Sequence, residues 1–297
     1  MKKVFIMVFV VFILLTLTFS ADFTALKTEI SFYNNGQLIR GILTEPAEMS
    51  ATCPAILILN GFAENKNGMD ITGTEEAMYE MTARIFAENG IASLRIDFIG
   101  SGESEGKWEN TTFSSQINDA IEAINYIQSI PRINPNRIGV LGLSQGGLVA
   151  ACTASRDDKV KTAVLWSPVS VPAYTYSDIL GWDVVIESLS LEGDEMLEAT
   201  LPWGPTTFLK KPFYQELFLI DPVAEIAKYN GPLMVVVGLR DATVFPQPQM
   251  GMLFTKYHDG LEKLVILDSD HMLDVIENSQ DLEVAISEAL YWFNLTL

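Results

Sequence analysis

Cysteine is scarce in this chain of 297 residues, which contains only Cys53 and Cys152. Two cysteines do not make a disulfide framework, so the fold is not expected to depend on a bridge between them. Cys53 stands just before a predicted strand, and Cys152 lies within a predicted helix. We therefore expect both to be small buried side chains.

Basic residues are also few. Nineteen lysines and arginines stand against 38 aspartates and glutamates, which leaves a formal net charge of −19. A body this acidic repels phosphate groups, so nucleic acids and anionic membrane surfaces are not expected as partners. The sequence also lacks internal repeats, low-complexity tracts and linkers between domains, and residues 21–297 are expected to form one domain. Nothing in the sequence indicates an oligomeric state.

The first twenty residues differ in character from the rest. Two lysines precede an apolar run over residues 4–15, and small residues follow it near Ser20. This pattern is typical of a secretory signal peptide over residues 1–20, and it predicts a secreted or periplasmic protein without a stable membrane partner after cleavage. An uncleaved N-terminal anchor is the alternative, because the run extended to Phe19 approaches the length of a membrane span.

Short apolar runs alternate with helical patterns along most of the chain, after a hairpin that turns at Asn34-Asn35-Gly36. This alternation predicts an α/β fold with a doubly wound, mostly parallel sheet. Strands are expected at residues 55–59, 91–98, 137–143, 162–168, 233–238 and 262–270. Helices are expected at residues 74–89, 116–128, 147–155 and 282–293.

Residues 169–220 interrupt the alternation, because they contain no clear strand. An unstructured loop of that length is unusual in a compact domain. We therefore expect a small, largely helical cap inserted after the strand at residues 162–168. The segment is rich in aromatic residues, which are Tyr174, Tyr176, Trp182, Trp203, Phe208, Phe213, Tyr214 and Phe218.

The sequence Gly142-Leu143-Ser144-Gln145-Gly146 fits the motif G-x-S-x-G. This spacing lets a serine occupy a sharp turn between a strand and a helix. Alone the motif is only moderately specific, since glycine and serine are common. A serine hydroxyl is a weak nucleophile unless a neighbouring base takes its proton, so the interpretation of Ser144 depends on finding a histidine.

Histidine is as scarce as cysteine, and only His258 and His271 are present. His258 stands before Asp259-Gly260, a turn signal after a helix, and is expected to be a surface residue without a catalytic role. His271 follows the predicted strand at residues 262–270, at the carboxyl edge where open α/β sheets build their sites. Elimination and position both make His271 the candidate base.

The imidazole of a catalytic histidine needs an acid that fixes its tautomer. Asp241 follows the predicted strand at residues 233–238 and lies on the same sheet edge. Asp268 and Asp270 are nearer in sequence, but neighbours on one loop normally point elsewhere, and these two are expected to be polar loop residues. The chain order Ser144, Asp241, His271 is the order that α/β-hydrolases use.

Acyl transfer also needs two N–H groups directed at the developing oxyanion. Gln145, directly after the serine, supplies one through its backbone at a helix N-terminus. The other is expected from Phe62, in the loop after the strand at residues 55–59, where Gly61 would let the backbone approach a substrate closely. These roles require no cofactor and no metal ion, and none is expected.

Several motifs follow one another along the chain, and His271 comes after the last of them. They are NGFAENKNG, ENGIASLRIDFIGSGESEG, GLSQGG and GLRDATVFP. Over residues 26–296 the chain resembles the α/β-hydrolase superfamily and is most similar to its bacterial cinnamoyl and feruloyl esterase branch. The resemblance implies an α/β-hydrolase fold. It also implies a nucleophile, acid and base at Ser144, Asp241 and His271.

The same resemblance implies oxyanion donors at Phe62 and Gln145. One departure is plain, because the histidine that the family carries before Gly-Phe is Asn60 here. The donor remains, but the hydrogen bonds that hold its loop must differ.

The sequence therefore predicts a secreted serine carboxylesterase that works through an acyl-enzyme, on hydroxycinnamate (feruloyl-type) or short-chain acyl esters. The aromatic residues of the cap either wall a pocket for the acyl group or form the core of the cap. A peptidase or a monoacylglycerol lipase of the same fold is an alternative. A non-catalytic binding protein on the same scaffold is another, since a fold alone does not prove activity.

Overall fold

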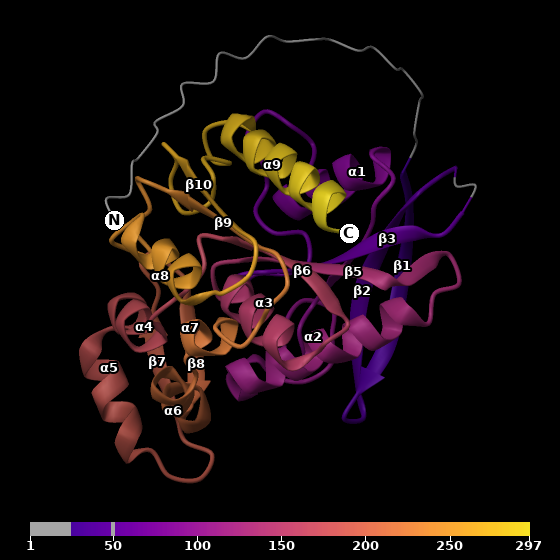
Figure 1. The fold of residues 1–297 in the computed structure, drawn as a ribbon. Coiled ribbons are helices and arrows are strands. Elements are labelled where there is room, and N and C mark those ends of the chain that lie inside the picture. Colours follow the sequence, from indigo (N-terminus) through magenta and orange to yellow (C-terminus); the bar gives the residue numbers. More distant parts are fainter. Residues whose placement is uncertain (1–24, 49–50) are drawn as a thin grey trace, which may run out of the picture.

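An eight-stranded sheet runs through the centre of the computed structural model, which describes residues 25–48 and 51–297 (Figure 1). The predicted signal peptide lies outside the described residues. The strand order is β1-β2-β4-β3-β5-β6-β9-β10, and every pairing from β4 to β10 is parallel. The strands are β1 (Ala25–Asn34), β2 (Gln37–Pro46), β3 (Cys53–Leu59), β4 (Ala92–Ile96), β5 (Ile133–Leu143), β6 (Val160–Trp166), β9 (Leu233–Gly238) and β10 (Glu262–Leu267).

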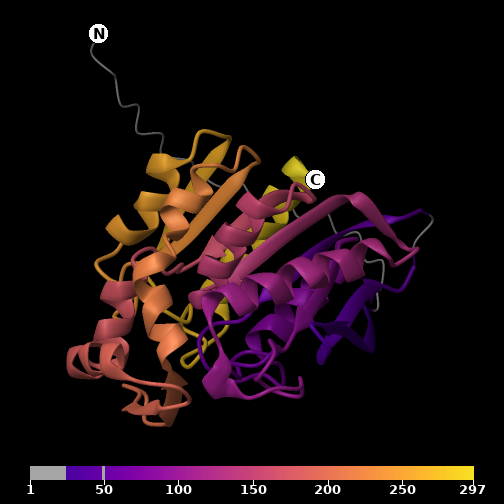
Figure 2. The same ribbon diagram turned by 90° about the horizontal axis from the view of Figure 1, so that it is seen from below.

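Helices cover both faces of this sheet. One face carries α1 (Met78–Glu88) and α9 (Gln280–Thr296), whose buried side chains share one apolar cluster. The other face carries α2 (Phe113–Gln128), α3 (Gln145–Arg156), α7 (Pro222–Ile226) and α8 (Gln249–Tyr257), which contribute to a second cluster. In the view from below, the magenta helices α2 and α3 lie in front of the sheet (Figure 2). The predicted doubly wound α/β fold is confirmed.

The apolar run of β3 shows why central strands need no polar residues. Leu57 and Leu59 enter the cluster on the side of α2 and α3, while Ile56 and Ile58 enter the cluster on the side of α1 and α9. Alternate residues of a strand point to opposite faces, so a strand buried on both faces is apolar throughout. No helix within the described ranges combines the length and apolar character needed to cross a bilayer.

Local signals fix most element ends. The β1-β2 hairpin turns at Asn35 and Gly36, both with positive φ (48° and 80°), as a two-residue turn of this kind requires. Helix α2 begins with a capping box in which Thr112 and Ser115 satisfy each other's backbone N–H groups. Helix α1 starts four residues later than expected, because the Thr74 hydroxyl accepts a hydrogen bond from the Glu76 N–H and holds a turn there.

The segment expected to form a cap lies between β6 and β9. It contains α4 (Pro172–Leu180), α5 (Trp182–Glu187), a short 3₁₀ turn, β7 (Met196–Thr200), β8 (Thr206–Lys210) and α6 (Lys211–Leu219). The antiparallel β7-β8 hairpin was not expected from the sequence. These elements gather at one end of the molecule (Figure 1). They are joined to the core where Trp108 Nε1 donates to Thr207 Oγ1 at 2.8 Å and the Ser114 N–H donates to Glu216 Oε2 at 2.8 Å.

Both cysteines are buried free thiols, as predicted. A further buried polar group, Asp119 on α2, ties this helix to the end of β1 and to the loop after β4. Its carboxylate accepts hydrogen bonds from Asn34 Nδ2 at 2.7 Å and from the Ile99 N–H at 2.9 Å. Burial raises the pKa of Asp119 to about 6.

The raised pKa of Asp119 gives a prediction about stability. Because Asp119 ionises less readily in the folded than in the unfolded chain, stability falls as the pH rises from about 4 to about 6. Asp119→Asn removes this titration. Between about pH 4 and pH 7 we expect the free energy of unfolding of the variant to gain up to about 3 kcal/mol relative to the wild type. Urea unfolding at a series of pH values measures this.

The control is Asp183→Asn, which alters an exposed carboxylate on α5. Its free energy of unfolding should keep a constant difference from the wild type over the same range. A constant difference for Asp119→Asn as well would contradict the prediction.

Candidate active site

Ser144 occupies the turn between β5 and α3 in a conformation that non-glycine residues rarely adopt, with φ 55° and ψ −117°. Backbone hydrogen bonds hold it on both sides: its N–H donates to the Trp166 carbonyl at 2.9 Å, and its carbonyl accepts the Val169 N–H at 3.2 Å as well as two N–H groups of α3. Strained backbone of this kind persists only where its surroundings enforce it, and it clusters at functional sites.

The two glycines of the motif are required by close backbone contacts. A Cβ on Gly142 would stand 2.1 Å from the carbonyl oxygen of Gly146. A Cβ on Gly146 would stand 2.2 Å from the carbonyl oxygen of Leu59, at the end of β3. Side chains at these positions would push α3 away from β5 and β3, so G-x-S-x-G is here a packing requirement of the turn.

His271 and Asp241 leave the carboxyl ends of the neighbouring strands β10 and β9. His271 Nδ1 lies 2.8 Å from Asp241 Oδ2. The other carboxylate oxygen of the buried Asp241 accepts the N–H groups of Thr243 and Val244 at 2.9 and 2.8 Å. The carboxylate is therefore fixed on one side by its own loop and faces the imidazole with the other.

The two other aspartates near His271 have different partners. Asp268 forms an ion pair with Arg240 at 3.2 Å. Asp270 Oδ1 accepts the N–H groups of Met272 and Asp274 at 2.9 and 2.8 Å, and so shapes the loop that carries His271. Of the three candidate acids, Asp241 alone is the one that the structure brings to the imidazole.

Ser144 and His271 line one cavity of about 510 Å³ at the carboxyl edge of the sheet. Phe62 lines it as well, so the structure brings the serine, the histidine and one predicted oxyanion residue together. Asp241 stands behind the histidine. Apolar side chains contribute much of the remaining wall, and they are Met69, Ile179, Trp203, Met272 and Ile276.

His258 is elsewhere, and the expectation that it lies on the surface is wrong. The residue is 6% exposed, at the end of α8. Its Nε2 lies 2.9 Å from the Gly231 carbonyl oxygen, and its Nδ1 accepts the Gly260 N–H at 3.2 Å. Both ring nitrogens therefore have backbone partners, and His258 holds together the turns around it.

The predicted oxyanion donors come from two segments that meet at the Ser144 turn. Gln145 is the first residue of α3, and Phe62 follows the end of β3. Within the described part of the chain, neither backbone N–H donates to a protein acceptor. The Phe62 ring is buried against Trp108 and Tyr176, each with a centroid distance of 5.3 Å. Two unused N–H groups beside a serine are the donors that a tetrahedral oxyanion needs.

Asn60, which replaces the histidine of the resembled family, holds the loop of Phe62 differently. Its Nδ2 donates to the Glu64 carbonyl at 3.2 Å. The Glu64 carboxylate in turn accepts the Gly61 N–H at 2.8 Å and the Tyr79 hydroxyl at 3.0 Å. Burial raises the pKa of Glu64. Glu64 could not be predicted from the sequence, because no local pattern shows that a loop carboxylate folds back onto its own backbone.

A buried ion pair joins the same loop to the next one. Lys66 Nζ lies 2.7 Å from Asp97 Oδ2, and the Lys66 N–H donates to Asp97 Oδ1 at 2.7 Å. Asp97 also accepts the Glu103 N–H at 2.9 Å. The motifs NGFAENKNG and DFIGSGESEG thus meet at Asp97, which fixes the loop after β3 against the loop after β4.

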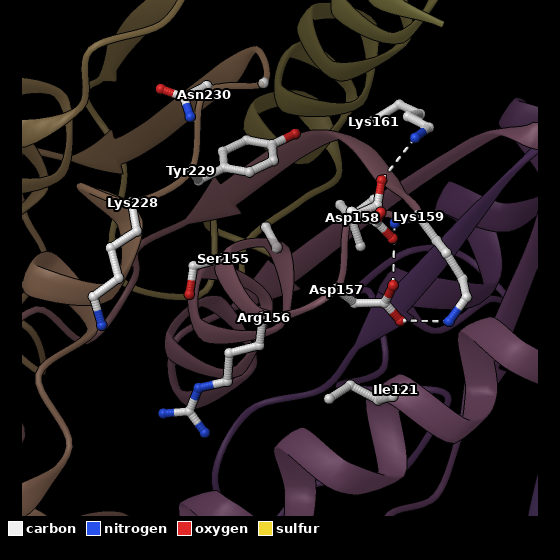
Figure 3. Close-up of a pocket in the computed structure, with 13 residues that line it drawn as sticks. Ile121, Ser155, Arg156, Asp157, Asp158, Lys159, Lys161, Lys228, Tyr229 and Asn230 are labelled. Carbon is white, nitrogen blue, oxygen red and sulfur yellow. Dashed lines mark hydrogen bonds and ion pairs between the residues drawn. The ribbon is translucent and has the colours of Figure 1, made fainter.

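A second cavity, of about 660 Å³, lies near the amino end of β6, away from Ser144 (Figure 3). Lysine and aspartate make up five of the residues that line it, and the lysines among them have partners. Lys159 pairs with Asp157 at 3.3 Å, and Lys161 donates to the Asp158 carbonyl at 2.7 Å. The cavity of Ser144 and His271 is therefore the candidate active site.

A comparison with known protein families shows to which family this chain belongs. Residues 77–296 match the prolyl oligopeptidase family. The chain belongs to the prolyl oligopeptidase family. The matched segment contains Ser144, Asp241 and His271 together with the cap.

Individual relatives match shorter stretches of this chain than the family model does. The protein YtaP of Bacillus subtilis, which its name describes as a hydrolase, is 32% identical over 139 residues, 40% of this chain and 45% of YtaP. The quorum-quenching protein AidA of Acinetobacter baumannii is 28% identical over 141 residues, 47% of this chain and 43% of AidA. The chain thus spans less than half the length of these curated relatives.

Solved structures extend the likeness to almost the whole fold. Est1E from Butyrivibrio proteoclasticus, solved with ferulic acid bound, has a TM-score of 0.71 at 24% identity, over 90% of this chain and 98% of Est1E. The α/β hydrolase GrgF from a Penicillium species has a TM-score of 0.72 at 19% identity, over 91% of this chain and 98% of GrgF. The predicted α/β-hydrolase fold is confirmed by this likeness.

The Glu64 contacts give a prediction for the loop of Phe62. Glu64→Ala leaves the Gly61 N–H and the Tyr79 hydroxyl without their acceptor, and we expect the free energy of unfolding to fall by about 2 kcal/mol. Glu64→Gln keeps an acceptor oxygen, so its loss should stay below about 1 kcal/mol. Chemical denaturation measures both variants, and equal losses would contradict the bracing role of the carboxylate.

Proposed function

We propose that this protein is a serine hydrolase that cleaves carboxylic esters through an acyl-enzyme. One observation carries the proposal: Ser144, on its strained turn, lines the same cavity as His271. The Nδ1 of His271 is hydrogen-bonded to the buried Asp241 at 2.8 Å. A nucleophile, a base and a group that orients the base are the parts that acyl transfer requires.

The chemistry follows from these contacts. The carboxylate of Asp241 accepts a hydrogen bond from the Nδ1–H of His271 and so fixes the tautomer in which Nε2 can take the proton of Ser144. The serine oxygen attacks the ester carbonyl, and the N–H groups of Phe62 and Gln145 stabilise the resulting oxyanion. The alcohol leaves with the proton from His271. His271 then activates a water molecule, which releases the acid and restores Ser144.

The cavity indicates the class of acyl group. Met69, Ile179, Trp203 and Ile276 give it an apolar wall, and its volume of about 510 Å³ suits an aromatic or medium-length acyl chain. Ferulic acid is the ligand named in the structure of Est1E, and this supports hydroxycinnamate esters as first substrates to test. Short-chain acyl esters and monoacylglycerols belong to the same panel.

Most cap aromatics do not wall this cavity. Of the eight aromatic residues in the segment, Trp203 alone is part of the described lining. Tyr176, Phe213 and Tyr214 are buried in packing, and the others lie at the surface of the cap. The cap therefore contributes to the acyl pocket mainly through Trp203 and Ile179, and only three of its eight aromatic side chains form its own core.

A peptidase activity is the second candidate, because the family that the chain belongs to is named for oligopeptide cleavage. The same residues would act, with His271 delivering its proton to an amine leaving group. Peptide substrates in the panel distinguish the two candidates.

The triad gives a prediction about activity. Ser144→Ala and His271→Ala should each lower kcat by about 10⁴-fold or more, because the members of such a unit depend on one another. His258→Gln is the matched control. It should lose stability, since His258 is buried with two backbone partners, while the folded variant keeps its kcat. Hydrolysis of a chromogenic acetate ester measures all three.

Comparable losses in folded His258→Gln and His271→Ala would show that the roles are assigned wrongly. A wild-type protein that cleaves no ester or peptide and does not react with a fluorophosphonate would be a binding protein on a hydrolase scaffold.

The apolar wall gives a prediction about selectivity. Trp203→Ala and Ile179→Ala should lower kcat/KM for a feruloyl ester by about 10-fold or more, because each removes an apolar contact worth about 1 to 3 kcal/mol. The acetate ester is too short to reach them and should change by less than about 3-fold. Trp182→Ala, which alters an exposed cap tryptophan outside the cavity lining, is the control and should change neither. Equal losses on both esters would show that this wall does not select.

A further inference from the structure

A buried chain of polar side chains runs behind the Ser144 turn. The Gln145 amide is at its centre, because Nε2 donates to Gln116 Oε1 on α2 at 2.6 Å. Its Oε1 accepts the hydroxyl of Tyr176 on α4. Gln116 Nε2 continues the chain to Thr111 Oγ1 at 3.2 Å. All four residues are at most 2% exposed, so each of these hydrogen bonds is made without competition from water.

Tyr176 contacts the second oxyanion residue as well. Its ring packs edge-on against Phe62, with a centroid distance of 5.3 Å. Phe113 and Phe213 pack against the same ring at 5.6 and 5.3 Å. One side chain from the cap therefore touches both residues whose backbone N–H groups are unused beside Ser144. Burial raises the pKa of Tyr176 well above its ordinary value, so the hydroxyl remains a donor at any working pH.

We propose that Tyr176 is a positioning residue for the oxyanion site, acting through its hydroxyl on Gln145 and through its ring on Phe62. The inference rests on the proposed function of this site and adds that the cap helix α4 takes part in setting the rate of the chemical step.

The physical reason is the geometric demand on oxyanion donors. They stabilise the transition state only when they lie within hydrogen-bond distance of the place where the oxyanion forms. Gln145 opens α3, where no preceding helical turn holds its N–H. Clamping the Gln145 side chain between α2 and α4 restricts that first turn. Without the tyrosine hydroxyl, Gln145 Oε1 would be buried without a donor, and the amide would turn toward another partner.

Tyr176→Phe is the test, because it removes the hydroxyl and leaves the ring against Phe62. Tyr214→Phe is the matched control. Tyr214 is also a buried tyrosine of the cap, but its hydroxyl has no hydrogen-bond partner in the described structure, and it does not line the cavity. Both variants lose one buried hydroxyl, but only Tyr176→Phe loses the contact with Gln145.

For Tyr176→Phe we expect kcat to fall by about 10- to 100-fold with KM within about 3-fold of the wild type, because the loss acts in the transition state. The factor should be the same for acetate and feruloyl esters, since the oxyanion forms on the carbonyl in both. Tyr214→Phe should retain the wild-type kcat. Gln116→Met, which breaks the same chain from the other side, should make the added effect of Tyr176→Phe smaller in the double variant.

The inference is overturned by a Tyr176→Phe kcat within about 2-fold of the wild type, or by an equal fall in Tyr214→Phe. A loss that depends on acyl length also overturns it, because Tyr176 would then be a pocket residue. Failure of the proposed function looks different, since the wild type would then show no Ser144-dependent hydrolysis.

If the wild type shows no such hydrolysis, hydrogen exchange still tests whether Tyr176 positions the Ser144 turn. Faster amide exchange over residues 143–148 in Tyr176→Phe than in Tyr214→Phe supports the positioning role. Equal exchange in the two variants overturns it.

Discussion

The backbone contact between the Ser144 turn and the end of β3 is the constraint on which the site depends. Gly146 stands so close to the Leu59 and Asn60 carbonyls that a single Cβ would come within 2.6 Å of both. The start of α3 and the start of the Phe62 loop are therefore pressed together. The serine and both candidate oxyanion residues lie within a few residues of this contact. Their relative positions are therefore set by main-chain packing, and side-chain motion changes them little.

Carboxylates in the surrounding loops act mainly as acceptors for backbone N–H groups. Asp97 holds the loops after β3 and β4 together, Glu64 holds the Gly61 N–H, and Asp241 holds its own loop before it reaches His271. A chain with net charge −19 thus places several of its acids where their hydrogen bonds define loop shape. Loops fixed in this way can present catalytic groups from a rigid scaffold, as preorganised electrostatic stabilisation requires.

The chain order of the sheet strands and of α1, α2, α3 and α9 could be predicted from the sequence, and so could the residues that meet at the carboxyl edge. Both follow from local patterns: apolar runs of strand length, helical periodicity, and motifs at strand ends. His258 shows where this reasoning stops. The turn signal after it was interpreted correctly, but its burial depends on Gly231, 27 residues earlier in the chain.

The β7-β8 hairpin was missed for a related reason, since two strands of five residues each are too short to leave a clear periodic signal. Glu64 and Tyr79 are 15 residues apart, and Tyr176 and Gln145 are 31 apart. Contacts at such separations are decided by tertiary packing, which no window of sequence contains. The residues that meet at the candidate site could therefore be predicted, whereas the residues that support them could not.

One helix of the cap, α4, carries both a residue of the cavity wall and a residue that contacts Gln145. Ile179 lines the cavity, and Tyr176, three residues earlier on α4, bonds to Gln145. Residues three apart lie on the same side of a helix, so a shift of α4 that opens the acyl pocket also moves the hydroxyl that holds Gln145. A substrate that packs well against Ile179 would stabilise α4 in the position where Tyr176 reaches Gln145. For the proposed esterase, binding of the acyl chain and alignment of the oxyanion donors would then be the same packing event, and energy from the remote part of the substrate would be used at the carbonyl.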